Sequence, residues 1–170
     1  MTATALNPDV ITAGKLEIKV TRVPRTRALP PGKELGFGRI FTDHMFAMDY
    51  EEGRGWFDAR IVPYGPIAID PGASALHYGQ AMFDGLKAFR AEDGRILMFR
   101  GRRHAARMSD GAPRLGMAAP DAQTIHDAMM ALVDFERDWV PSEPGTALYL
   151  RPTIIGTEGF LGVRAGKKYM

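Results

Sequence analysis

The sequence contains no cysteine, which excludes disulfide bonds, thiolate metal sites and cysteine nucleophiles. Its four histidines, at positions 44, 77, 104 and 126, include no short-spaced ligand pair, so we expect no zinc site. Charge of one sign is also scarce, because 22 Lys and Arg residues face 20 Asp and Glu residues. A net charge of +2 is too small to direct the protein to nucleic acid or to an anionic membrane.

Long apolar runs are absent as well. The run at 128–133 falls far short of the ~20 residues that a membrane-spanning helix needs. The first residues, MTATALNPDVITAGK, lack the basic start and apolar stretch of a secretory signal. We therefore expect a cytoplasmic protein without a membrane partner. The 170 residues, 45% hydrophobic and 25% charged, suit one globular domain or one domain plus a fragment of another.

The hydrophobic pattern divides the chain into a lead and one domain. Residues 1–14 show no periodicity and are interpreted as a flexible N-terminal arm, followed by a domain over 15–170. Alternating or short apolar runs predict strands at residues 16–21, 45–50, 60–62, 67–69 and 147–155. Leu86–Phe89 and Ile96–Phe99 flank a turn at 92–94 and predict a β-hairpin. Residues 156–166 form a Gly-rich loop, and the basic pair before Tyr169 is typical of the start of a strand.

Two helices are expected after the hairpin. The first spans 101–108, and the second spans 121–138, where apolar residues recur at helical spacing behind Asp121 as the N-cap. Strands followed by helices, without regular alternation, predict an α+β fold. We expect a mostly antiparallel sheet packed against these two main helices.

Four arginines form the first candidate site: Arg100, Arg102, Arg103 and Arg107. They follow a strand and enter a helix, where guanidinium forks and backbone N–H groups suit a phosphate. The alternative, more frequent for charge runs, is a solvated helix face. Arg107 lies one helical turn beyond Arg103, so it is the member that can face inward.

The strand around Tyr149 and Arg151 is the second candidate, because alternation places both side chains on one side. An arginine in an apolar strand needs an anion, either a ligand carboxylate or an acid of the same chain, and both remain open. A third candidate joins His77 and Tyr78 to Phe83 and Gly85, with close approach of a flat ligand and plain core packing as alternatives. The adjacent residues 42–44 (Thr-Asp-His) point apart on a strand and cannot form a catalytic relay.

Several blocks of the sequence, in order and spacing over residues 36–170, resemble the branched-chain amino acid aminotransferases, a pyridoxal-phosphate (PLP) family of fold type IV. The matching blocks are GFG at 36–38, FTDHM at 41–45, LHYG at 76–79, FDGLKAFR at 83–90, YLRPT at 149–153 and GTE at 156–158. The resemblance implies the small domain of such an enzyme. It also implies PLP as cofactor, a cytoplasmic homodimer and a role in branched-chain amino-acid biosynthesis.

The resemblance assigns roles residue by residue. Arg107 matches the arginine that holds the PLP phosphate, and Tyr149 and Arg151 match the pair on the substrate side. The other matched positions also contribute to substrate binding. Some form an aromatic wall or the backbone beside it, and others reach across the dimer interface into the neighbouring site. They are Phe37 and Phe83 for the wall, Gly85 beside it, and Tyr78, Leu161 and Val163 at the interface.

One element of the family is missing from the sequence. The resemblance places the Schiff-base lysine in a larger second domain beyond residue 170, so none of the lysines present is assigned a catalytic role. The whole protein is expected to exchange the amino group between leucine, isoleucine or valine and 2-oxoglutarate, whereas residues 1–170 alone are expected to be inactive. The alternatives are a D-amino acid transaminase, an aminodeoxychorismate lyase, or a non-enzymatic anion- or nucleic-acid-binding module.

Overall fold

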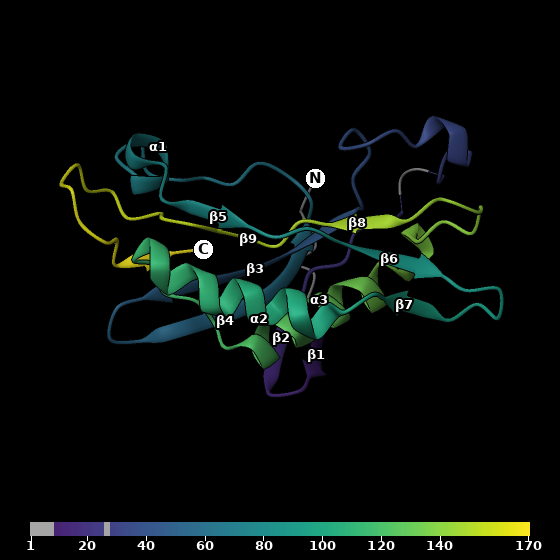
Figure 1. The fold of residues 1–170 in the computed structure, drawn as a ribbon, viewed down its shortest axis with the longest axis horizontal. Helices are drawn as coiled ribbons and strands as arrows, with labels where there is room; N and C mark the ends of the chain where they lie inside the picture. The colour runs from purple at the N-terminus through teal and green to yellow at the C-terminus, as the bar shows by residue number, and fades with distance from the viewer. Residues whose placement is uncertain (1–8, 26–27) are drawn as a thin grey trace, which may run out of the picture.

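The computed structural model describes residues 9–25 and 28–170, which form three sheets and two long helices (Figure 1). The strands are β1 (Asp9–Ala13), β2 (Leu16–Val20), β3 (His44–Glu51), β4 (Gly55–Pro63), β5 (Ala81–Phe83), β6 (Leu86–Arg90), β7 (Ile96–Met98), β8 (Leu148–Leu150), β9 (Thr153–Ile155) and β10 (Lys168–Tyr169). The helices are α1 (Ser74–Tyr78), α2 (Gly101–Gly111) and α3 (Ala122–Phe135), with short 3-10 turns at Gly32–Glu34, Ala112–Leu115 and Arg137–Trp139. This content is α+β, as the sequence predicted.

The largest sheet has the order β1-β2-β4-β3-β10. Only β2 and β4 run parallel in it, and all its other pairs are antiparallel. In β2 the predicted alternation holds, because Ile18 and Val20 are buried while Glu17 and Lys19 are exposed. The sheet is therefore buried on one face.

Two shorter strand pairs form one interrupted antiparallel ribbon. β5 pairs with β9, with Phe83 opposite Thr153, and β6 pairs with β8, with Leu86 opposite Leu150. Between these pairs lie residues 84–85 on one strand and 151–152 on the other. The Asp84 N–H donates to the Pro152 carbonyl at 3.0 Å across this gap, which we call the ribbon break.

The ribbon break corrects the single strand expected over 147–155. Pro152 has no N–H to donate, so the strand divides into β8 and β9, which belong to different sheets. The predicted hairpin is confirmed as β6 and β7, closed by the Ala91 N–H bond to the Arg95 carbonyl at 2.9 Å. Gly94 takes the φ of +81° that this turn requires.

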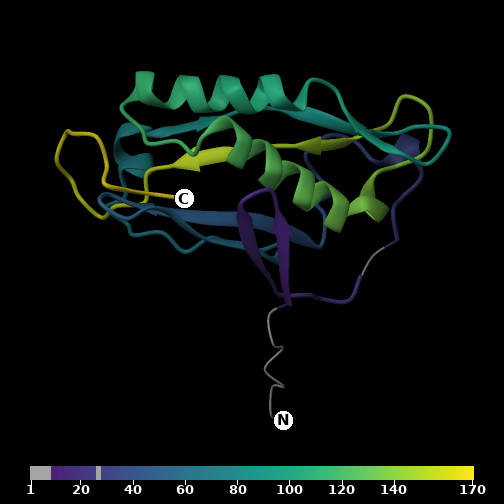
Figure 2. The same ribbon diagram turned by 90° about the horizontal axis from the view of Figure 1, so that it is seen from below.

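The two predicted helices are present: α2 lies against the ribbon, and α3 lies between the ribbon and the large sheet (Figure 2). Asp121 caps α3 by accepting the Thr124 N–H at 2.9 Å, and α3 ends at Phe135, with a 3-10 turn completing the predicted span. One core cluster joins α2 and α3 to the ribbon through Met108, Met129 and Leu150. A second cluster joins the other side of α3 to the large sheet, so α3 packs between the two layers.

Two more expectations need correction, and one is confirmed. The arm predicted over 1–14 is wrong for residues 9–13, which form β1 against β2, while residues 1–8 lie outside the described part. The strand predicted at 67–69 is absent, and no pattern in the sequence indicated α1 or β5 nearby. The strand start expected before Tyr169 is confirmed as β10, on the edge of the large sheet.

Candidate cofactor and substrate site

Aromatic and basic side chains gather at the ribbon break. The Arg151 guanidinium lies 4.2 Å from the ring centroid of Phe83, and its Nη2 donates to the Tyr149 hydroxyl at 3.1 Å. Phe37 meets the Tyr149 ring edge-on at 5.0 Å between centroids. The structure therefore brings together four residues that the sequence singled out: Phe37, Phe83, Tyr149 and Arg151.

Gly85 lies directly beneath Tyr149. A Cβ at this position would come within 1.9 Å of the Tyr149 hydroxyl and 2.7 Å of its Cζ. Only glycine leaves room for the phenol to lie against the backbone there. Of the two alternatives for Gly85, close approach is therefore observed, but the approaching ring is Tyr149 of the same chain.

The arginine cluster does not act as a unit. Arg102 donates to Gln123 at 2.7 Å, and the Arg100 guanidinium lies 5.4 Å from the ring centroid of Phe99. Arg107 instead reaches the ribbon break, where Nε donates to Asp84 Oδ2 at 2.7 Å and Nη2 donates to Oδ1 at 2.5 Å. Its side chain is nevertheless 68% exposed. The structure thus separates Arg107 from its neighbours in sequence.

Asp84 is a site residue that the sequence analysis missed. Its carboxylate is 2% exposed and also receives the Gly85 N–H at 2.5 Å, while His104 Nδ1 lies 3.0 Å from Oδ1. Burial alone would raise the pKa of Asp84, but the hydrogen bonds from Arg107, His104 and Gly85 outweigh it and lower the pKa to about 2. An acidic residue beside a glycine, directly before the strand predicted at Leu86–Phe89, was the signal available in the sequence.

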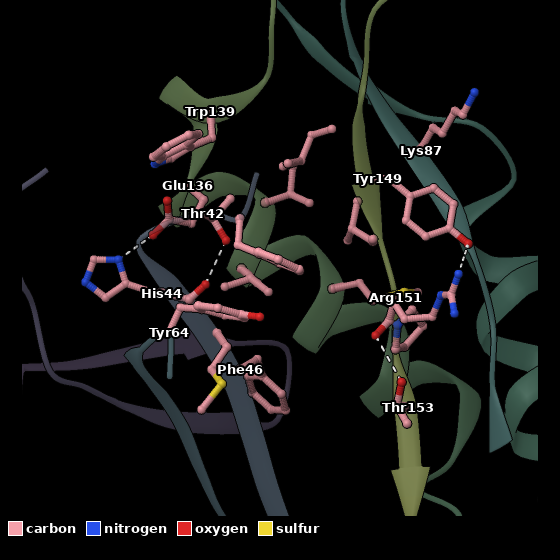
Figure 3. A pocket seen from close by; sticks show the side chains of 18 of the residues that line it. Thr42, His44, Phe46, Tyr64, Lys87, Glu136, Trp139, Tyr149, Arg151 and Thr153 are labelled. Carbon is pink, nitrogen blue, oxygen red and sulfur yellow. Dashed lines mark hydrogen bonds and ion pairs between the residues drawn. The ribbon is translucent and has the colours of Figure 1, made fainter. Parts of the chain in front are cut away.

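The main cavity has a volume of about 850 Å³ and lies between the large sheet, α3 and the β8–β9 strands. Tyr149 and Arg151 stand on one side of it, and Thr42, His44 and Glu136 stand on the other (Figure 3). Most of the remaining lining is apolar, including Phe37, Phe46, Met129, Leu132 and Leu150. A cavity of this size and character suits a small aliphatic ligand with a charged end.

His44 and Glu136 form a buried pair at the far side of the cavity. His44 Nε2 accepts the Val23 N–H at 3.0 Å, so the Nδ1–H donates to the Glu136 carboxylate. Burial raises the pKa of Glu136 despite this hydrogen bond. Thr42 donates to the His44 carbonyl, and Asp43 accepts the Trp139 indole N–H. In these contacts, the side chains of residues 42–44 bond to three different groups.

Tyr78, Leu161 and Val163 lie apart from the main cavity. The Tyr78 hydroxyl donates to the Leu161 carbonyl, and the Val163 side chain is 89% exposed. Tyr78 and Val163 line a smaller hollow of about 330 Å³. None of the three contributes to the 850 Å³ cavity of its own chain.

The part of the chain that the structure describes contains neither a metal-binding cluster nor a membrane-spanning helix. Residues 9–25 and 28–170 contain no group of three or more His, Asp or Glu side chains placed to hold a metal ion. Over the same ranges, every helix is too short or too polar to extend across a lipid bilayer.

Curated relatives match most of the chain, whereas no family model matches it. Branched-chain-amino-acid transaminase 1 of Bacillus subtilis is 50% identical over 140 residues, which are 82% of this chain. The branched-chain-amino-acid aminotransferase of Mycobacterium tuberculosis is 47% identical over 165 residues, or 94% of this chain. Over most of its own length, the chain is therefore similar to the branched-chain aminotransferases.

The match extends over only part of these relatives. The chain spans 39% of the length of the Bacillus protein and 45% of the Mycobacterium protein.

Solved structures of branched-chain aminotransferases share the fold. The Escherichia coli enzyme has a TM-score of 0.53 at 19% identity. The aligned part is 74% of this chain and 39% of the Escherichia coli chain. The enzyme of the archaeon Thermoproteus uzoniensis, solved with norvaline, has a TM-score of 0.52 at 19% identity, with the same two coverages of 74% and 39%. A third structure, complexed with N-(5'-phosphopyridoxyl)-L-glutamate, has a TM-score of 0.52 at 23% identity and also covers 74%.

Proposed function

We propose that residues 1–170 are the small domain of a PLP-dependent branched-chain aminotransferase. The complete protein would exchange the amino group between leucine, isoleucine or valine and 2-oxoglutarate, as a cytoplasmic homodimer serving amino-acid biosynthesis. The observation that carries the proposal is the ribbon break, which gathers Arg107, Arg151 and Tyr149 beside the aromatic wall of Phe37 and Phe83.

The residues at the ribbon break fit PLP. A phosphomonoester needs a fixed cation with a free N–H edge, and the fork to Asp84 occupies only Nε and Nη2 of Arg107. Within residues 9–25 and 28–170, Nη1 of Arg107 has no hydrogen-bond partner. Arg107 would therefore hold the phosphate. When bound, PLP supplies an electron sink for bond changes at the amino acid's α-carbon.

The remaining residues of the site bind and orient the substrate. Arg151 rests on Phe83 and donates one N–H to Tyr149, so its other donors are available to a substrate carboxylate. Phe37 and Phe83 provide apolar area for a branched aliphatic side chain and exclude water from it. These residues supply recognition, and they supply no amine for the reaction.

The lysines of this chain do not suit the catalytic role. All six are exposed: Lys15, Lys19, Lys33, Lys87, Lys167 and Lys168. Lys19, Lys167 and Lys168 are ion-paired with carboxylates. A lysine that reacts with a carbonyl must be held against the reacting carbon inside the site, which an exposed or ion-paired surface lysine is not. The catalytic lysine would then come from chain beyond residue 170.

Tyr78, Leu161 and Val163 would complete the site of the second subunit. Support comes from their exposure of 45%, 65% and 89%, which is high for large apolar side chains, and from their position outside the cavity of their own chain.

The proposal is tested on the purified complete protein. We expect a subunit mass well above 18.7 kDa, the visible absorbance of bound PLP, and formation of glutamate from 2-oxoglutarate with leucine as amino donor. D-Alanine as the better donor, or turnover of aminodeoxychorismate, would assign the protein to another fold-type-IV activity instead.

The substrate preference is tested by Phe83→Ala in the complete protein. Removing the Phe83 ring should lower kcat/KM for leucine, by an amount equivalent to about 1–3 kcal/mol of activation free energy. The loss for alanine should be much smaller, because alanine has no branched chain to contact the ring. Phe99→Ala is the matched control, because Phe99 is 70% exposed against 62% for Phe83, and its ring lies beneath Arg100 rather than Arg151. Equal losses for leucine and alanine would show that Phe83 has a structural role only.

A further inference from the structure

Asp84 occupies a rigid position at the ribbon break. Its backbone N–H donates to the Pro152 carbonyl at 3.0 Å, and its carboxylate receives the N–H of Gly85. The residue is 4% exposed, so water does not compete for the carboxylate. The backbone of Asp84 is thus held by the opposite strand, and its carboxylate by the N–H of Gly85.

Two side chains of one helix converge on this carboxylate. His104 and Arg107 lie three residues apart on α2, which places them on the same face. His104 Nδ1 lies 3.0 Å from Oδ1, and Arg107 makes a two-pronged contact through Nε and Nη2. A two-pronged contact fixes the plane of the guanidinium as well as its position.

The contact determines which edge of Arg107 is available. Its side chain is 68% exposed, so without a partner it would sample many rotamers. Asp84 holds the Nε and Nη2 edge, which leaves the Nη1 edge for an anion. We propose that Asp84 is a positioning residue, which holds Arg107 ready for the 5'-phosphate of PLP with His104 as a second partner. This inference rests on the proposed function.

The charge of Asp84 acts in the opposite direction. A carboxylate beside the phosphate site weakens the attraction for a phosphate, so its removal alone would tighten phosphate binding. Positioning predicts weaker binding instead. The sign of the change therefore separates the two effects.

The test uses the complete protein stripped of cofactor, with PLP and pyridoxal as probes, because pyridoxal lacks only the phosphate. Arg107→Ala should lower PLP affinity by roughly ten- to a hundred-fold, and Asp84→Asn by roughly five- to ten-fold, as expected for loss of charged hydrogen bonds. Pyridoxal affinity should change less than about two-fold in both. Asp49→Asn is the matched control, since Asp49 pairs with Arg60 at 2.6 Å between β3 and β4.

The outcomes separate the two levels of the argument. Unchanged PLP affinity in Arg107→Ala would overturn the phosphate assignment in the proposed function. A loss in Arg107→Ala with unchanged or tighter binding in Asp84→Asn would overturn the positioning role alone. Equal losses for PLP and pyridoxal in Asp84→Asn would also overturn it, because general damage affects both probes.

A measurement on the unmodified protein covers the case in which Asp84→Asn does not fold. Exchange of the Arg107 Nε–H with water is followed by nitrogen NMR in the cofactor-free protein, with Arg107→Lys identifying the signal. We expect exchange markedly slower than that of Arg102, which is exposed and donates to Gln123 through Nη1 instead. Exchange as fast as that of Arg102 would overturn the positioning role.

Discussion

At the scale of single residues, Gly85 is the most sharply constrained position in the site. Gly85→Ala would place a methyl group 1.9 Å from the Tyr149 hydroxyl, so the ring must move away from Arg151. We expect a loss of about 1–3 kcal/mol in the free energy of unfolding and a lower kcat/KM for leucine in the complete protein. Chemical denaturation and steady-state kinetics measure the two effects.

Gly65→Ala is the control for this prediction. A Cβ at Gly65 meets no atom within 4 Å, and the backbone there has no positive φ. Stability and kinetics should therefore stay close to those of the unmodified protein. If Gly85→Ala behaves like Gly65→Ala, the tight contact with Tyr149 is not important for the site.

The ionised Asp84 makes stability depend on acid. Its pKa is about 2 in the folded protein against 3.8 as the ordinary value, so the folded state favours the carboxylate. The resulting stabilisation is present above about pH 4 and is lost as the pH falls toward 2. It should amount to about 1–2 kcal/mol, because the exposed Arg107 is partly screened by solvent.

Unfolding of the unmodified protein and of Asp84→Asn, measured at pH values from about 5 to 2, checks this prediction. The unmodified protein should lose stability more steeply than the variant as the pH falls. Parallel curves would mean that Asp84 does not carry the acid-sensitive stabilisation.

The sequence predicted some of these residues and missed others for a physical reason. Alternation on one strand was enough to place Tyr149 and Arg151 together, and their hydrogen bond confirms it. Helical spacing indicated that Arg107 can face inward, but not that Asp84 receives it. That contact depends on how α2 packs on the ribbon, and no local pattern encodes it.

At the scale of elements, the ribbon break shows where pattern and chemistry disagree. The apolar alternation continues through residues 147–155, which predicts one strand. Pro152 lacks the N–H that a continuous ladder needs, and the strand changes partner from β6 to β5 at that point. The signal was present in the sequence. Arg151 lies in this interruption, with its guanidinium 4.2 Å from the ring centroid of Phe83.

Helix α3 was predictable because its pattern is long and its cap is explicit. Asp121→Ala removes the carboxylate that accepts the Thr124 N–H at 2.9 Å, and it should cost about 1 kcal/mol in the free energy of unfolding. Asp134→Ala, on the same helix, removes an ion pair with Arg137 at 3.5 Å, and the Asp134 side chain is 77% exposed. This change should cost less than about 0.5 kcal/mol in the free energy of unfolding.

Thermal or chemical unfolding of these two variants compares the cap with an ordinary surface charge. Equal losses would show that the Asp121 cap does not stabilise α3. By contrast, β1 and α1 had no comparable signal. A five-residue strand with one hairpin partner and a five-residue helix depend on tertiary contacts rather than on periodicity.

At the scale of the whole molecule, much apolar surface is uncovered. Phe37, Phe83, Leu161 and Val163 are each more than 60% exposed. Exposed apolar surface of this kind marks an interface with other protein. The chain covers about two fifths of its relatives' length, and under the proposed function the remaining part of the enzyme would cover this surface. An isolated 1–170 chain should therefore associate non-natively, which light scattering measures.

The central claim is that residues 1–170 recognise cofactor phosphate and substrate but contain no lysine that performs the chemistry. The most direct measurement compares glutamate formation from leucine and 2-oxoglutarate by the isolated chain and by the complete protein, each supplied with PLP. The account predicts turnover by the complete protein and none by the isolated chain above the rate with free PLP. Steady glutamate formation by the isolated chain above that rate would contradict it.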